Sequence, residues 1–122
     1  MKHIQLSDLT FESRDGYERA VLFTPEDLSA NTKVQVIRIE PRSEVKPHYH
    51  KVRTECFKIL SGTGRVMVGD VAVVSKDEMI LCEPNVHHAF VNNSDNEYLY
   101  VQVIRTNDPS ADDLYWVEEN KE

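Results

Sequence analysis

Cysteine is scarce in this sequence of 122 residues, with only Cys56 and Cys82 present and no C-x-x-C pair. A zinc knuckle or a dithiol redox centre requires closely spaced cysteines, so both kinds of site are excluded. Isolated cysteines in a reducing compartment usually act as small apolar side chains. We therefore expect both cysteines to lie in the protein core.

Basic residues are in the minority, because 14 Lys and Arg stand against 21 Asp and Glu, giving a formal net charge of -7. A protein that binds nucleic acid or an anionic membrane surface does so by neutralising phosphates with positive side chains. The composition therefore predicts no nucleic-acid partner and no membrane partner.

Long apolar runs are also absent. Runs such as residues 71–74 fall far short of the roughly 20 residues that span a bilayer. Residues 1–8 lack the apolar stretch and the small-residue cleavage site of a signal peptide. We therefore expect a cytoplasmic protein.

Short segments in which apolar and polar residues alternate dominate from residue 33 onward, and this period of two is typical of strands with one buried face. Gly69 and Asp70 join two of these segments into a predicted β-hairpin. The pattern predicts an all-β sandwich or barrel. Its expected strands are residues 34–39, 57–60, 66–68, 71–74, 79–82, 89–91 and 98–104.

The length corresponds to a single domain over residues 1–122, large enough to fold without disulfides or a structural metal. We expect the barrel core over about residues 33–105, N-terminal strands within residues 1–32, and an acidic tail over residues 106–122. From residue 112 onward we expect this tail to be loosely held, with Leu114, Tyr115 and Trp116 as its only anchor. One short helix is predicted over residues 24–29, where a threonine cap precedes a proline and an acidic first turn.

Four of the five histidines gather at two places, and a carboxylate follows the first. Residues two apart on a strand point to the same face, so His48 and His50 project together. Glu55 lies an odd number of residues beyond His50 and joins that face only if the chain turns within residues 51–53. A third imidazole from a distant strand would complete a set of three nitrogens and one oxygen.

Such a ligand set suits a divalent transition metal, because imidazole favours Fe, Ni, Cu and Zn while a carboxylate also suits Mn and Fe(II). An octahedral metal would keep two positions open for substrate, water or dioxygen, whereas a tetrahedral zinc held by all four ligands would be closed and structural. A lone His-x-His pair is more often solvated or hydrogen-bonded than metal-bound. The ligand types alone leave these alternatives open.

Two sequence motifs resemble those of the cupin superfamily. The first resembles the cupin pattern in its proline, its His-x-His pair, its glutamate and the closing Gly62, and it spans residues 47–62. The second spans residues 84–92, opens with Pro84 and ends with Asn92. The resemblance covers about residues 33–105.

The resemblance implies a cupin jelly roll, a double-stranded β-helix barrel of antiparallel strands that holds one divalent transition metal (Fe, Mn, Ni or Zn). The spacing to Asn92 favours His88 over the neighbouring His87 as the third imidazole. The implied metal ligands are His48, His50, Glu55 and His88.

The resemblance also implies a function. We expect a mononuclear metalloenzyme that acts on a small, oxygen-rich metabolite by dioxygenase-type or isomerase-type chemistry. Residues 53–63 are similar to the cupin region of bacterial phosphomannose isomerases. The alternative is a non-catalytic cupin module that binds a metal and a small ligand.

A basic segment surrounds the first motif, since residues 42–65 contain six Lys and Arg against two Glu. A basic rim around the metal would attract an anionic ligand such as a carboxylate or a sugar phosphate. The alternative is a set of strand charges that face outward into solvent.

No residue outside the ligand set is assigned as catalytic. Four side chains are candidates for a catalytic acid or base if the fold brings them to the cavity; they are Tyr49, Glu78, His87 and Tyr100. Tyr49 lies between His48 and His50 in the sequence, so its side chain should face away from them. Period-two alternation offers candidates for an apolar cavity wall, with ordinary core packing as the alternative for each; they are Phe57, Ile59, Met67, Phe90 and Tyr100. Open sheet edges and the resemblance lead us to expect a homodimer, with residues 1–24 and 98–104 as candidate surfaces.

Overall fold

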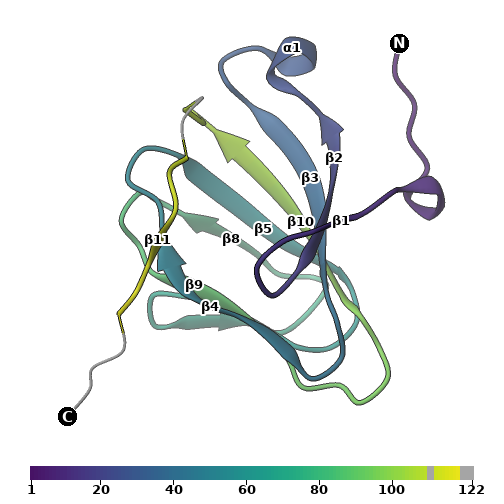
Figure 1. Cartoon of the computed structure of the whole chain (residues 1–122), viewed down its shortest axis with the longest axis vertical. Coiled ribbons are helices and arrows are strands. Elements are labelled where there is room, and N and C mark those ends of the chain that lie inside the picture. Colours follow the sequence, from purple (N-terminus) through teal and green to yellow (C-terminus); the bar gives the residue numbers. More distant parts are fainter. Residues whose placement is uncertain (110–111, 119–122) are drawn as a thin grey trace.

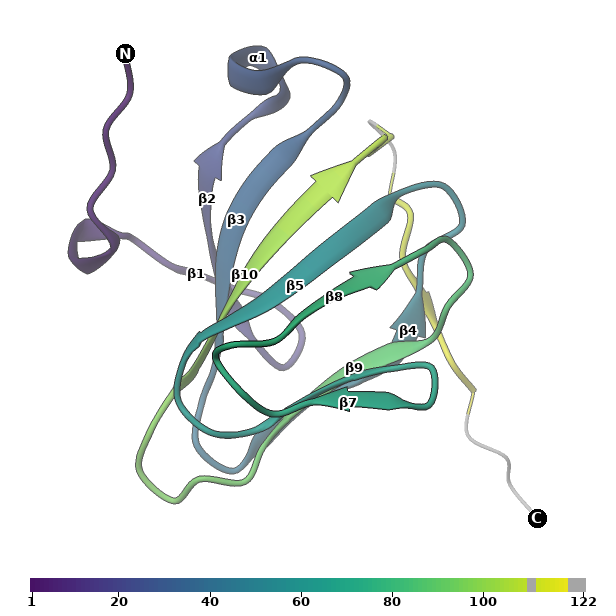
Figure 2. The same cartoon turned by 180° about the vertical axis from the view of Figure 1, so that it is seen from behind.

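The computed structural model describes residues 1–109 and 112–118, which form two antiparallel β-sheets facing each other (Figures 1 and 2). The six-stranded sheet has the order β1-β2-β3-β10-β5-β8, and the five-stranded sheet has the order β11-β4-β9-β6-β7. In sheet order, the first six strands are Glu12–Ser13, Glu18–Phe23, Lys33–Ile39, Leu99–Thr106, Thr54–Ser61 and Met79–Cys82. The other five are Tyr115–Trp116, Ser43–Tyr49, His88–Asn92, Arg65–Val68 and Val71–Val73. The predicted all-β jelly roll is confirmed.

Helical structure is limited to one 3-10 turn, Leu6–Asp8, and the helix α1, Pro25–Leu28, within the described ranges. The side chain of Asp27 accepts a hydrogen bond from the backbone N–H of Thr24 at 3.0 Å, which forms part of a capping box at the threonine that the sequence indicated as the cap. None of the helices in the described residues has the length and apolar character needed to cross a bilayer.

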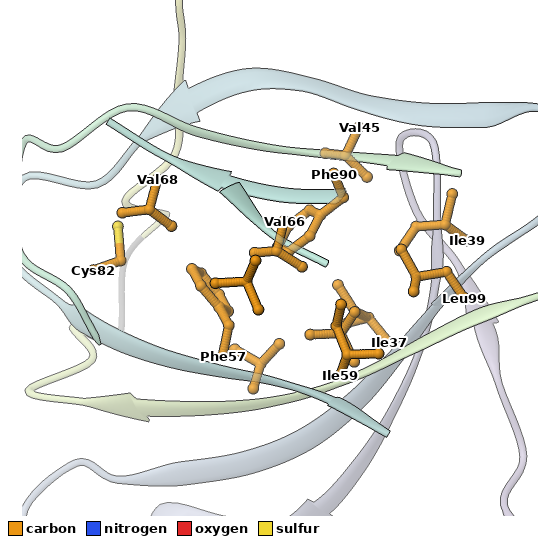
Figure 3. Close-up of a cluster of buried hydrophobic side chains, with 13 residues drawn as sticks. Ile37, Ile39, Val45, Phe57, Ile59, Val66, Val68, Cys82, Phe90 and Leu99 are labelled. Carbon is orange, nitrogen blue, oxygen red and sulfur yellow. The ribbon is translucent and has the colours of Figure 1, made fainter. Parts of the chain in front are cut away.

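Apolar side chains from both sheets meet between the layers and form the core (Figure 3). Ile37 and Ile39 enter from β3, Phe57 from β5, and Val66 from β6, each at most 3% exposed. These residues alternate with outward-facing ones along each strand, as the period-two pattern predicts. Burial of these side chains provides the main stabilisation of the barrel.

The prediction of a cavity-wall position was wrong for two residues, because strand alternation directs their side chains outward. Val66 and Val68 are buried in β6, so Met67 between them faces away from the core. Tyr100 likewise lies on the outer face of β10, where its ring packs 6.1 Å from that of Phe11. Ile59 is buried in the core but is not among the residues that line the cavity described below.

The two cysteines also differ in position. Cys82 is 2% exposed and belongs to the core, as expected, whereas Cys56 is only half-buried. Cys56 follows the inward-facing Glu55 and precedes the inward-facing Phe57, so its thiol lies on the outer face of β5. Both thiols are free.

The end of the barrel opposite the histidines is held by the side chain of Asn92, which is 1% exposed. Its amide nitrogen lies 2.9 Å, 3.1 Å and 2.9 Å from the carbonyl oxygens of Ile39, Glu40 and Glu97. Its amide oxygen accepts the backbone N–H of Ser94 at 3.1 Å. One side chain therefore links the end of β3, the end of β9 and the loop before β10.

Replacing Asn92 by alanine should lower the free energy of unfolding by about 2–4 kcal/mol, because several buried backbone groups lose their partner. Urea denaturation of the purified variant measures this loss. The exposed neighbour Asn93 provides the control, since Asn93→Ala should change stability by under about 0.5 kcal/mol. Equal stability of the two variants would contradict the assigned role of Asn92.

Candidate metal and ligand site

A bulge in β4 sets the direction of the first two histidines. Val45 pairs with Phe90 and His48 pairs with His88, so β4 contains one more residue than β9 between these pairs. The extra residue falls beside Pro47, which has no N–H to donate to the ladder. The bulge allows Val45 and His48 to face inward although they are three residues apart, and His50 then follows on the same side.

The turn predicted between His50 and Glu55 is present, and Asp113 holds it. The carboxylate of Asp113 accepts the backbone N–H groups of Lys51, Val52 and Arg53 at 2.8 Å, 2.9 Å and 3.1 Å. Burial would raise the pKa of Asp113, but these three donors hold it below its usual value. The expectation of a loosely held tail was therefore wrong at this point.

Each of the three inward-facing histidines is anchored through Nδ1 to a backbone carbonyl. His48 bonds to Lys46 at 2.8 Å, His50 to Asp113 at 2.6 Å and His88 to Val86 at 3.1 Å. A carbonyl only accepts hydrogen bonds, so Nδ1 carries a proton in each ring and Nε2 is the nitrogen left for a metal. Metal-binding histidines are typically oriented in this way. One ring nitrogen from each histidine lies within 4.8 Å of the others, close enough for one metal ion.

Glu55 reaches these imidazoles from the opposite sheet. Its Oε1 lies 2.8 Å from Nε2 of His50 and 3.3 Å from Nε2 of His88. Its Oε2 accepts a hydrogen bond from Nε of Arg105 at 2.8 Å. Burial would raise the pKa of Glu55, but hydrogen bonds to both histidines and the charge of Arg105 hold it well below its usual value. Glu55 is therefore a buried carboxylate with one oxygen directed to the imidazoles.

The histidines themselves are in different electrostatic states. Burial and the positive charge of His88 lower the pKa of His48 to about 3, so its imidazole is neutral. Burial also opposes the charge on His88, but hydrogen bonds with Cys82 and Glu55 raise the pKa of His88 to about 9. Its Nε2 is buried and lies 3.3 Å from Oε1 of Glu55. A buried imidazole nitrogen directed at a carboxylate oxygen fits a role as a metal ligand.

A cavity of about 280 Å³ adjoins the histidines. Phe57, Phe90 and Trp116 form much of its apolar wall, which confirms two of the predicted wall residues. Its basic lining was predicted from the wrong segment, because only Arg53 of the six basic residues within 42–65 lines the cavity. The remaining arginines of the cavity lie after β1, on β2 and on β10; they are Arg14, Arg19 and Arg105.

The model of the cupin domain family matches residues 35–104, which include all four predicted ligands. This chain belongs to the cupin family. No curated protein matches it in sequence.

Several solved structures share the fold of this cupin at low sequence identity. A predicted oxalate decarboxylase from Thermotoga maritima is 19% identical, with 87% of this chain and 99% of that chain covered and a TM-score of 0.76. The polyketide cyclase RemF from Streptomyces resistomycificus is 18% identical, with 99% and 88% covered and a TM-score of 0.77. The cupin domain of Cnp3 from Schizosaccharomyces pombe is 16% identical, with 87% and 74% covered and a TM-score of 0.72.

None of the four acid or base candidates lines the cavity of this cupin as the structure describes it. Tyr49 faces outward, where its ring stacks on His87 at 5.1 Å and on Tyr115 at 5.4 Å. Glu78 is exposed and Tyr100 lies on the outer face of β10.

The polar residues at the site that sequence reasoning missed include Arg19, Gln35, Arg105 and Asp113. The first three lie at inward-facing positions of strands. Knowing how β2, β3 and β10 pair would have shown that these side chains point into the cavity. Asp113 carries no local sequence signal, because its partners lie far away in the sequence.

Replacing Asp113 by alanine should lower the free energy of unfolding by about 1–3 kcal/mol, because three backbone N–H groups lose their acceptor. Thermal or urea denaturation measures the effect. The adjacent and exposed Asp112 is the matched control, and Asp112→Ala should be nearly neutral. If both variants lose the same stability, Asp113 does not hold the turn.

Proposed function

We propose that this cupin binds one divalent transition metal through His48, His50, Glu55 and His88, and that it is a mononuclear metalloenzyme acting on a small, oxygen-rich, anionic metabolite. The observation that carries the proposal is the shared orientation of the three imidazoles. Each is fixed by a backbone carbonyl at Nδ1, which leaves the three Nε2 atoms for a metal, and those of His50 and His88 lie 2.8 Å and 3.3 Å from Oε1 of Glu55.

The donor set fits a transition metal such as Fe, Mn, Ni or Zn, because it combines three imidazole nitrogens with one carboxylate oxygen. When bound, such a metal supplies a Lewis acid for ligand oxygens, or a redox centre if it is iron or manganese. Arg105 holds one oxygen of Glu55 and leaves the other for the metal.

The cavity supports a small anionic ligand. Phe57 and Phe90 exclude water from one side, while the arginines supply positive charge in a chain that is acidic as a whole. The names of two structural neighbours, a predicted oxalate decarboxylase and a polyketide cyclase, refer to oxygen-rich compounds and agree with this ligand class. The shared fold does not carry their reactions to this chain.

Elemental analysis of untagged protein purified without chelators should find about one equivalent of Fe, Mn, Ni or Zn. His48→Ala, His88→Ala and Glu55→Gln should each lower metal affinity by at least about 10-fold, because each removes a ligand or its charge. Circular dichroism of each variant verifies that it has folded.

Two matched controls accompany these variants. His87 is adjacent to His88 but exposed and stacked on Tyr49, and Glu44 is exposed on β4. His87→Ala and Glu44→Gln should retain the metal content of the parent. A parent protein that takes up none of these metals, even after incubation with each ion, would rule out the proposed centre.

A non-catalytic binding module is the second candidate, and one observation favours it. The four acid or base candidates from the sequence all lie outside the cavity. Oxygen uptake and product analysis of the metal-loaded protein with small hydroxy acids and sugar phosphates separate the two functions. We expect turnover that Glu55→Gln abolishes; ligand binding without turnover across this panel would favour the binding module.

The homodimer, the cytoplasmic location and the absence of nucleic-acid and membrane partners stay predictions. Large exposed apolar side chains on and beside β7 and β8 add a further candidate for the dimer surface. They are Val71, Val74, Met79 and Leu81.

A further inference from the structure

The side chain of Gln35 is the most unusual polar group in the cavity outside the proposed metal ligands. It is 1% exposed, and neither its amide nitrogen nor its amide oxygen has a partner among the described residues. Its register neighbour on β10 is Val103, and Val103 in turn is opposite Phe57 on β5. The amide thus lies among apolar side chains, where an unsatisfied polar group is costly to folding.

Arg19 lies beside Gln35 on the same face of the sheet. It is opposite Ile37, which is two residues from Gln35 on β3, so both polar side chains project into the same cavity. The Nε of Arg19 is buried and also has no partner among the described residues. Two neighbouring strands therefore present unpartnered hydrogen-bonding groups to one space.

The charges of the other cavity arginines are already balanced. Arg105 is bound to Glu55 at 2.8 Å, Arg53 approaches Asp108 at 3.4 Å, and Arg14 pairs with Glu12 at 3.2 Å. No such ion pair is present for Arg19 within residues 1–109 and 112–118. Burial and the charge of Arg14 lower the pKa of Arg19, which is consistent with a cation in a positive environment. Arg19 is thus available for an anion.

The hydrogen-bonding groups define the chemistry of the missing partner. Arg19 and the amide nitrogen of Gln35 both donate, so they require acceptors such as the two oxygens of a carboxylate. The amide oxygen of Gln35 accepts, so it requires a donor such as a hydroxyl group. If the amide of Gln35 is rotated so that its nitrogen and oxygen change places, the ligand must still supply one acceptor and one donor.

We infer that Gln35 and Arg19 bind the far end of the ligand, and that this end is a carboxylate with a hydroxyl group next to it. The inference rests on the proposed function for the metal end of the same cavity. β3 is separated from β5, which carries Glu55, by two strand spacings, or about 10 Å. The ligand is therefore a small hydroxycarboxylate that spans from the metal ligands to β3.

Calorimetric titration of the metal-loaded protein tests this assignment with malate, succinate and glycerol 3-phosphate as probes. Malate carries both a carboxylate and a hydroxyl group, succinate lacks the hydroxyl group, and glycerol 3-phosphate replaces the carboxylate by a phosphate. We expect malate to bind most tightly. Gln35→Met should weaken malate binding by about 10-fold and succinate binding less, while Arg19→Met should weaken both.

The variant Gln102→Met is the matched control, because Gln102 lies on the outer face of the adjacent strand β10. It should leave the affinity for malate unchanged. Equal malate affinity in the parent and in Gln35→Met, tighter binding of glycerol 3-phosphate than of malate, or no malate binding at millimolar concentrations would each overturn the inference.

Thermal stability of the ligand-free protein gives a second and independent measurement. If Gln35 is kept for ligand binding, Gln35→Met should raise the melting temperature by about 3–6 °C, because it removes an unsatisfied buried amide. A lower melting temperature would assign Gln35 a structural role and overturn the inference. Metal content of the same samples tests the proposed function separately, since Gln35→Met should retain the metal while it loses malate binding.

Discussion

The buried carboxylate of Glu55 is the group on which the rest of the site depends. It projects from β5 in one sheet, and its Oε1 meets His50 and His88 from the other sheet. Its Oε2 is held by Arg105 on the adjacent strand β10. Because one oxygen faces the imidazoles and the other faces the arginine, the carboxylate joins the two sheets at the open end of the barrel. It also determines which of its oxygens is available to a metal.

Burying these charged and polar groups lowers the stability of the folded state, so stability alone does not explain the arrangement. Burying a carboxylate, a guanidinium and three imidazoles removes strong hydration, and well-packed apolar residues in such positions are often equally stable or more stable. The chain offsets this cost with backbone anchors at each histidine and with the apolar core that fills the other end of the barrel. A polar cluster with buried unpartnered atoms is typical of a site kept for ligand chemistry.

The strands were predictable because their period-two pattern is local, and the ligand motif was predictable because its residues lie close together in sequence. The positions that depend on strand register were not. Tyr100 was assigned to the wrong face because one residue of register reverses every side chain of a strand. Arg19 and Gln35 become neighbours only when β2 pairs with β3, and Asp113 reaches the turn after His50 only in the folded chain.

The two ends of the cavity have different origins along the chain. The cupin domain match covers residues 35–104 and includes every proposed metal ligand, whereas Arg19, Arg105 and Asp113 lie outside it and Gln35 is its first residue. The groups proposed to hold the metal thus belong to the part that this chain shares with its family. Of the two residues proposed to bind the far end of the ligand, Gln35 lies at the edge of the matched region, and Arg19 lies on β2, which precedes it. The proposed ligand contact of Arg19 therefore depends on a strand outside the family match, whereas the proposed metal ligands all lie within it.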